Sequence, residues 1–301
     1  MSHYSLYYLI PTAAFAMALA GCGRQADLGP VANIESAKAI RKVLSAGSAG
    51  GEETAVAEST GTGWATLRGQ FVYDGTPPQR QPYNVTKEHN ICAPGGQAPL
   101  QEKLVVDQDS RGIQHVAIYL REAPRVHDSA QPKTESVEFD QKVCVFLSHV
   151  KPVSVGQPIQ IKNSDPTGHN TKIEGRANTF NQTIPAGGSI PFTPQREETA
   201  PAPVSCSIHP WMSAYLFPRK NGYVAVTDVE GRFEIANLPA GEPIELQVWH
   251  ESGAAPGLGL VGATPDAPDV NWSNRGRVSI TLQPDETKEI KIVVPPSAFR
   301  G

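Results

Sequence analysis

Apolar and polar residues alternate over short stretches of this chain, and turn-forming residues separate the stretches. WATLRGQFVYDGTPP (64–78) alternates and then stops at a turn, and GIQHVAIYLREA (112–123) is a second such stretch. Residues 222–250 contain three strand-like pieces separated by DVEG and LPAGEP, and residues 277–296 contain two more, broken at QPDET. Alternation with a period of two predicts β-strands. The 27 glycines and 27 prolines favour many short strands over long helices, so we expect an all-β fold.

An apolar segment near the N-terminus, YYLIPTAAFAMALAGC (7–22), has the length of a signal peptide and is too short for a membrane span. Its end, LAGC, resembles the bacterial lipoprotein signal. That resemblance implies a signal peptide over residues 1–21, cleavage before Cys22 and a lipid on the Cys22 sulfur. Only His3, and no lysine or arginine, precedes the segment, so an ordinary signal peptide with Cys22 free or lost stays open. Both alternatives predict an exported protein.

Residues 22–62 are expected to be a flexible tether. VANIESAKAIRKVLSAG (31–47) is compatible with one amphipathic helix, and AGSAGGEETAVAESTGTG (46–63) follows with little to bury. A lipid anchor followed by such a tether would hold the folded part of the chain at a bacterial membrane, facing the periplasm or the cell surface. Membrane attachment through the lipid is therefore one expected interaction.

VTDVEGRFEIANLPAGEPIEL (226–246) resembles the second half of the carboxypeptidase regulatory-like, or transthyretin-like, β-sandwich. LRGQFVYDGTPP and HVAIYLR resemble its first half. The resemblance implies one sandwich made of residues 63–137 and 223–301, with a second β-sandwich, residues 138–222, inserted between its parts. An insertion at a loop is tolerated when the ends of the inserted domain lie close together.

Charge and motifs exclude several classes of function. The net charge is −4 and no Lys/Arg-rich tract occurs, so a nucleic-acid partner is not expected. The chain has no G-x-S-x-G, no H-E-x-x-H and no phosphate loop. We therefore expect neither an enzyme nor a small-molecule substrate.

The stretch CSIHPWM (206–212) places Cys206, His209 and Met212 at intervals of three residues. Thiolate, imidazole and thioether together suit a soft, redox-active metal, and copper is the first candidate. Zinc would accept the cysteine and the histidine, but methionine is a poor zinc ligand. The alternative is that Cys206 is half of a disulfide, Met212 lies in the core and His209 lies on the surface.

Upstream, the strand-like PIQIKN and the turn SDPTG lead to His169 and Asn170. Together with CSIHPWM this pattern resembles the cupredoxins, the small blue-copper electron-transfer proteins of the amicyanin and plastocyanin type. The resemblance implies a Greek-key sandwich and one type 1 copper ion, bound by His169, Cys206 and His209, with Met212 as a weak axial ligand. It also implies that Asn170 hydrogen-bonds the Cys206 sulfur. His209 would face solvent and pass the electron, with Trp211 beside it either at a docking surface or in the core.

The chain has four cysteines, and each can be given an expected role in turn. If Cys22 carries lipid and Cys206 binds metal, Cys92 and Cys144 remain, and an oxidising compartment favours a disulfide between them. A disulfide between Cys144 and Cys206, with Cys92 free, stays open and would abolish the metal site.

The remaining histidines form no H-x-H pair, so no second copper site is expected. His149 is expected to be structural or at the surface, His250 at the surface, and His115 on the solvated face of a strand. The resulting hypothesis is a one-electron carrier between redox partner proteins. Copper storage, delivery or sensing is one alternative, and a structural or adhesive protein without metal is another.

Overall fold

A computed structural model describes residues 61–300, so the signal segment, Cys22 and nearly all of the tether lie outside the described residues. The described residues form four β-sheets, which confirms the all-β prediction. They contain helical structure only in α2 (His89–Cys92) and in three 3-10 turns, at Pro94–Gly96, Asp128–Ala130 and Pro296–Ala298. None of the helices in this part of the chain is long and apolar enough to cross a membrane.

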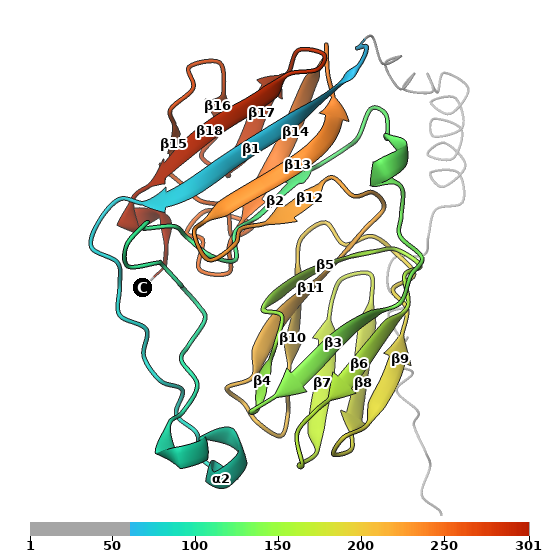
Figure 1. Cartoon of the computed structure of the whole chain (residues 1–301), viewed down its shortest axis with the longest axis vertical. Coiled ribbons are helices and arrows are strands. Elements are labelled where there is room, and N and C mark those ends of the chain that lie inside the picture. Colours follow the sequence, from blue (N-terminus) through green and yellow to red (C-terminus); the bar gives the residue numbers. More distant parts are fainter. Residues whose placement is uncertain (1–60, 301) are drawn as a thin grey trace, which may run out of the picture. The chain divides into compact units, whose positions relative to one another are not determined.

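Two sheets formed by residues 137–219 pack face to face, and we call them the inner sandwich. Their strand orders are β5-β11-β10-β7-β8 and β4-β3-β6-β9 (Figure 1). The strands are β3 (Val137–Lys142), β4 (Val145–Phe146), β5 (Val150–Ser154), β6 (Ile159–Asn163), β7 (His169–Glu174), β8 (Thr179–Ile184), β9 (Ser189–Phe192), β10 (Ala202–Ser205) and β11 (Ser213–Arg219). Alternate residues of β6, Ile159 and Ile161, are buried in one core with Phe139 of the neighbouring β3 and Leu216 of β11 in the facing sheet. Alternation in the sequence thus places one face of each sheet in the core.

The other two sheets form the outer sandwich, with strand orders β13-β1-β18-β15 and β12-β2-β14-β17-β16. Its strands are β1 (Trp64–Tyr73), β2 (Ala117–Leu120), β12 (Val224–Val226), β13 (Arg232–Pro239), β14 (Pro243–Trp249), β15 (Thr264–Pro265), β16 (Asn271–Trp272), β17 (Arg277–Thr281) and β18 (Thr287–Val294). The stretch predicted over 112–123 yields only the short β2. His115, with φ 65, interrupts the extended backbone before it.

The turn between β12 and β13 requires glycine at position 231. Gly231 has φ 75, and a Cβ there would lie 2.4 Å from the carbonyl oxygen of Phe71. Both the backbone conformation and the close approach of β1 therefore exclude a side chain at this position.

Arg219, at the end of β11, links the two sandwiches. Its guanidinium is buried and donates to the carbonyl oxygens of Leu120, at 2.8 Å, and of Glu198, at 3.2 Å. The Tyr119 hydroxyl donates to the carbonyl oxygen of Thr199 at 2.9 Å. The sandwiches thus meet partly through polar contacts, although Nε of Arg219 is buried without a hydrogen-bond partner. The domain limits at 137–138 and 222–223 stay predictions.

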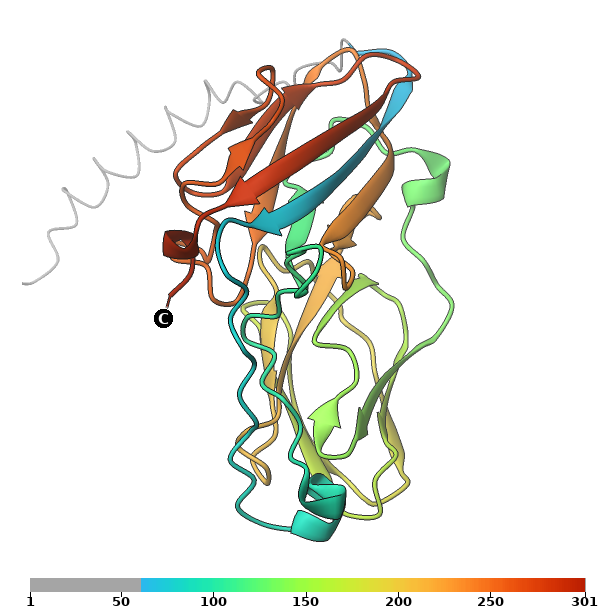
Figure 2. The same cartoon turned by 60° about the vertical axis from the view of Figure 1, so that its left-hand side comes forward.

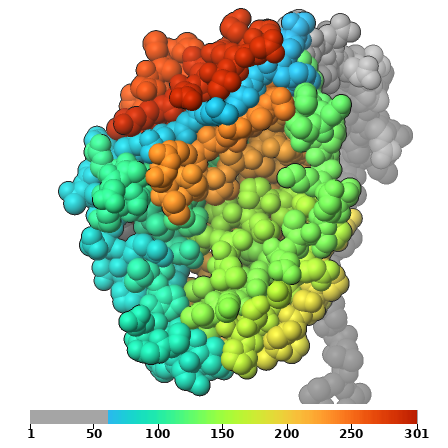
Figure 3. Space-filling view, viewed as in Figure 1, coloured from blue at the N-terminus to red at the C-terminus, as the bar shows by residue number. Residues whose placement is uncertain are grey.

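Residues 74–116 join β1 to β2, and we call them the α2 segment. Figures 1 and 2 show this segment leaving the outer sandwich, running along the inner sandwich to α2 at its far end, and returning. Its atoms lie directly against those of the inner sandwich in the space-filling view (Figure 3). A disulfide between Cys92 and Cys144, with Cα atoms 5.0 Å apart, fastens α2 to the turn between β3 and β4. The α2 segment therefore covers one end of the inner sandwich.

Candidate metal centre

His169, Cys206 and His209 come together at the end of the inner sandwich that carries α2. His169 begins β7, Cys206 directly follows β10, and His209 lies in the turn before β11. β10 pairs with both β7 and β11, which brings the three positions together. One ligand atom from each of the three side chains lies within 4.8 Å of the other two.

The two imidazoles turn the same nitrogen toward each other and the sulfur. The Nδ1 atoms of His169 and His209 are 2.9 Å apart, and Nδ1 of His209 is 3.9 Å from Sγ of Cys206. Cys206 is the free cysteine among the described residues, because Cys92 and Cys144 are bonded to each other. Two further groups with metal-like spacing both include a disulfide-bonded cysteine, which cannot act as a thiolate ligand.

The outward-facing nitrogen of each imidazole contacts a carboxylate. Nε2 of His169 is 2.7 Å from Oδ2 of Asp165, and Nε2 of His209 is 2.6 Å from Oε2 of Glu88. A carboxylate only accepts hydrogen bonds, so in neutral imidazoles the protons lie on Nε2 and the Nδ1 lone pairs face the sulfur. Metal-binding histidines commonly have such carboxylate partners, which fix the ring orientation. Sequence analysis did not identify either carboxylate.

Backbone N–H groups surround the Cys206 sulfur. Those of Asn170 and His209 donate to Sγ at 3.3 and 3.4 Å. Burial alone would raise the pKa of the Cys206 thiol, but the hydrogen bond to His169 and those from the backbone outweigh burial and lower it to about 6. Burial alone would lower the pKa of His169, but its hydrogen bonds to Asp165 and Cys206 raise it to about 9. The surroundings therefore favour a thiolate.

Asn170 and Met212 both hydrogen-bond the loop that carries Cys206 and His209. The side chain of Asn170 accepts from the N–H of Ser207 at 3.2 Å, so it connects β7 to the loop after Cys206. The expected contact to the Cys206 sulfur is made by the backbone N–H of Asn170. Met212 is buried in the same core, its N–H donates to the carbonyl oxygen of His209, and its own carbonyl oxygen accepts from the N–H of Cys206. These bonds fold residues 206–212 into a closed turn.

The expectation that His209 faces solvent is wrong. His169 and His209 are 0% exposed and Cys206 is 2% exposed, because the α2 segment covers them. Glu88 lies over His209 and also accepts from the Thr167 hydroxyl at 2.9 Å. Trp211 is half-buried, and its indole N–H donates to the carbonyl oxygen of Cys144 at 3.1 Å. This cover keeps water away from the ligand atoms. The side chain of Glu88, which is 36% exposed, lies between His209 and solvent.

Two expectations about the other histidines are also wrong. His250 is fully buried, although a surface position was expected, and its Nδ1 accepts from the N–H of Ser252. The side chain of His115 is mostly buried beside His149 rather than on a solvated strand face. His149, expected to be structural or at the surface, is buried.

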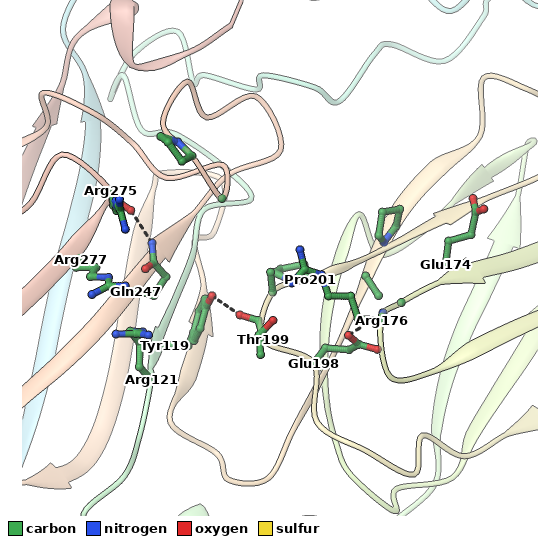
Figure 4. Close-up of a pocket in the computed structure, with 16 residues that line it drawn as sticks. Tyr119, Arg121, Glu174, Arg176, Glu198, Thr199, Pro201, Gln247, Arg275 and Arg277 are labelled. Carbon is green, nitrogen blue, oxygen red and sulfur yellow. Dashed lines mark hydrogen bonds between the residues drawn. The ribbon is translucent and has the colours of Figure 1, made fainter. Parts of the chain in front are cut away.

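A pocket of about 490 Å³ lies away from the Cys206 site (Figure 4). Tyr119, Arg121 and Arg277 line one side, and Arg176 and Glu198 line the other. The described residues that line it include no histidine or cysteine. The soft-metal chemistry therefore belongs to the buried site near α2 and not to this pocket.

No family model and no curated protein matches this chain. Among solved structures, a copper-containing nitrite reductase from Thermus scotoductus SA-01 is 18% identical over 30% of this chain and 23% of its own length, with a TM-score of 0.26. Amicyanin from Paracoccus versutus is 14% identical over 34% of this chain and 97% of its own, with a TM-score of 0.25. A purple cupredoxin from Nitrosopumilus maritimus is 16% identical over 28% of this chain and 99% of its own, with a TM-score of 0.24.

Proposed function

We propose that His169, Cys206, His209 and Met212 would hold one copper ion, and that this chain carries single electrons between partner proteins. The observation that carries the proposal is that one nitrogen of His169 lies within 4.8 Å of both a nitrogen of His209 and the sulfur of Cys206, although His169 is distant from them in sequence. Two nitrogens and one thiolate are a donor set that suits both Cu(I) and Cu(II), which is the chemistry copper supplies when bound here.

The surrounding residues support electron transfer by holding the ligand atoms still. Asp165 and Glu88 fix the two rings, and backbone N–H groups hold the sulfur. Asp165 also accepts from the N–H groups of Val143 and Cys144 at 2.7 and 2.8 Å, so the ring of His169 is tied to the disulfide. Ligands held in this way move little between oxidation states, which lowers the reorganisation that accompanies each electron.

Burial of the ligands favours electron transfer over copper delivery. A delivery protein must hand its ion to a partner, whereas His169, Cys206 and His209 are all buried. An electron needs only a short bonded path, and the His209–Glu88 hydrogen bond reaches the surface. The electron would therefore leave through the surface around Glu88.

Voltammetry of the copper-loaded protein tests the proposal. A reversible one-electron couple that is lost in Cys206→Ser is the expected result. Binding of Cu(I) alone, with ready release to a chelator and no reversible couple, would instead identify a storage or delivery protein. The exposed Glu138→Gln variant is the control and should retain the couple.

We also propose that the protein is exported and held at a bacterial membrane through lipid on Cys22. This proposal rests on the LAGC sequence, which lies outside the described residues. Mass spectrometry of the mature N-terminus should find Cys22 as the first residue, with acyl chains attached. An unmodified N-terminus at another position would contradict it.

A further inference from the structure

The pocket of about 490 Å³ in Figure 4 has arginine side chains on both sides. Arg121, Arg275 and Arg277 belong to the outer sandwich, whose side we call the outer wall, and Arg176 belongs to the inner sandwich, whose side we call the inner wall. Pockets that bind small molecules usually measure about 300–1,000 Å³, and a few polar groups in them decide which molecule binds. Guanidinium groups on both walls indicate a ligand with acidic groups.

The pairing of three strands places much of the outer wall on one face of a sheet. Gln247 of β14 lies opposite Tyr119 of β2 on one side and opposite Arg277 of β17 on the other. Residues that lie opposite one another in a sheet share a face, and all three line the pocket. Their neighbours Leu246 and Val278 are buried in the outer core. The outer wall is therefore the face of this sheet that points away from the core.

Arg176, on the inner wall, lies on a turn built around a buried carboxylate. Glu198 is 2% exposed, and its carboxylate accepts from the backbone N–H groups of residues 176–178 at 2.9–3.1 Å. A Cβ at Gly175 would lie 2.3 Å from Oε1 of Glu198, so the turn closes tightly over this carboxylate. These bonds fix the backbone of Arg176 at the pocket and satisfy the charge of Glu198 with N–H groups.

Arg275, on the outer wall, also lies on a turn that a side chain holds in place. The amide of Gln247 donates to the carbonyl oxygens of Arg275 and Val248, each at 2.8 Å. The N–H of Gly276 donates to the carbonyl oxygen of Ser273 at 3.0 Å, which closes the turn. The backbone of Arg275 is therefore fixed, while its side chain is exposed at the pocket.

The outer wall carries more positive than negative charge. Arg121 and Arg277 share one carboxylate, that of Glu245, which pairs with Arg121 and lies 3.7 Å from Arg277. Nε of Arg277 is buried without a hydrogen-bond partner, so this guanidinium is incompletely satisfied. Arg275 forms no ion pair with any residue that the structure describes. Three arginines and one glutamate leave two positive charges unbalanced on this wall.

The inner wall offers a further guanidinium without an ion pair. Arg176 forms none within the described part of the chain. The nearby carboxylates are already engaged, since Glu198 is satisfied by its turn and Glu174 pairs with Lys172 at 2.6 Å. An acidic group that enters the pocket therefore finds unpaired guanidinium groups on both walls.

We propose that this pocket binds a small organic dicarboxylate, with one carboxylate held by the arginines of the outer wall and the other by Arg176. Arginine presents a planar fork of N–H groups that matches the two oxygens of a carboxylate. Two separate acidic groups suit arginines on two walls better than one phosphate, which concentrates its charge in a single group. Such a ligand would bridge the two sandwiches, and this inference does not depend on copper at Cys206.

Calorimetric titration of the purified protein with glutarate, at low ionic strength and without added copper, tests the proposal. We expect one glutarate to bind about tenfold or more tightly than butyrate, which has a single carboxylate. Arg176→Gln and Arg275→Gln should each weaken glutarate binding by about tenfold. Arg232→Gln is the matched control, because Arg232 is an exposed arginine of β13 that pairs with Glu230, and it should leave the affinity unchanged.

Both Arg176 and Arg275 are exposed, so their glutamine variants are expected to fold, and thermal unfolding checks this. Absence of glutarate binding at millimolar concentration would overturn the proposal. Equal affinity for glutarate and butyrate, or tighter binding of inorganic phosphate than of glutarate, would also overturn it, because neither result needs acidic groups at both walls. Equal weakening by Arg232→Gln would show that net charge, and not this pocket, is responsible.

Discussion

Replacing Glu88 by glutamine should raise the reduction potential of the copper-loaded protein. Glutamine keeps the size of the side chain and an oxygen that can accept from Nε2 of His209, but it removes the negative charge. Burial alone would raise the pKa of Glu88, but hydrogen bonds to Thr167 and His209 lower it, so the carboxylate is charged at neutral pH. Cu(II) places more positive charge on its ligands than Cu(I) does. The charge of Glu88 therefore stabilises the oxidised state more.

The magnitude follows from the 2.6 Å contact between Glu88 and His209. Hydrogen bonds to charged groups contribute about 1.5–3 kcal/mol. Because Glu88 is 36% exposed, solvent screens it and the lower figure applies. A difference of about 1.4 kcal/mol is tenfold in an equilibrium constant, or about 59 mV for one electron. We therefore expect the potential to rise by roughly 60 mV.

Voltammetry of wild type and Glu88→Gln at one pH and ionic strength measures the shift. Glu138→Gln is the control for loss of a charge, because Glu138 is an exposed carboxylate of the inner sandwich that pairs only loosely with Lys162, at 3.5 Å. An unchanged or lower potential in Glu88→Gln would refute the reasoning. An equal rise in both variants would show that net charge, and not the contact to His209, is responsible.

Three other expectations follow from the structure. Replacing Cys92 and Cys144 by alanine removes a cross-link between residues 52 apart in sequence and should lower the free energy of unfolding by about 4 kcal/mol. An unchanged urea midpoint would contradict this stabilising role of the disulfide. Burial raises the pKa of Tyr119 to about 12, although two nearby arginines lower it, so stability present below pH 10 should be lost as the pH rises through 12. The stability advantage of wild type over Tyr119→Phe should therefore shrink by up to about 3 kcal/mol between urea titrations at pH 9 and pH 12, and a constant difference would contradict this. Asn170→Ala removes the acceptor for the N–H of Ser207, so it should lower the free energy of unfolding by about 1–2 kcal/mol and speed copper loss to a chelator. A rate of copper loss equal to that of wild type would contradict the proposed connection between β7 and the Cys206 loop.

Much of the candidate site could be predicted because its ligands are local in sequence. Cys206, His209 and Met212 lie in one turn, so their spacing alone indicates soft-metal chemistry. His169 required the resemblance of the preceding strand and turn to a known pattern. Its partner Asp165, only four residues earlier, was available in the same turn, but a carboxylate in a loop is ordinarily explained by solvation.

The cover over the site could not be predicted in the same way. Glu88 reaches His209 across 121 residues of sequence, and the α2 segment that carries it has no strand or helix periodicity that fixes its path. The burial of His209 and the grouping of His115 with His149 depend on that path. Strand positions were predictable from alternation, whereas the late start of β2 within the 112–123 stretch depends on the backbone conformation of His115.

The central claim is that a thiolate and two imidazoles bind one copper ion, and the visible absorption and electron spin resonance spectra of the Cu(II)-loaded protein test it most directly. We predict an intense visible thiolate-to-copper band and one equivalent of bound copper, both lost in Cys206→Ser. A protein that remains colourless with Cu(II), or whose spectra are the same in Cys206→Ser, would contradict the claim.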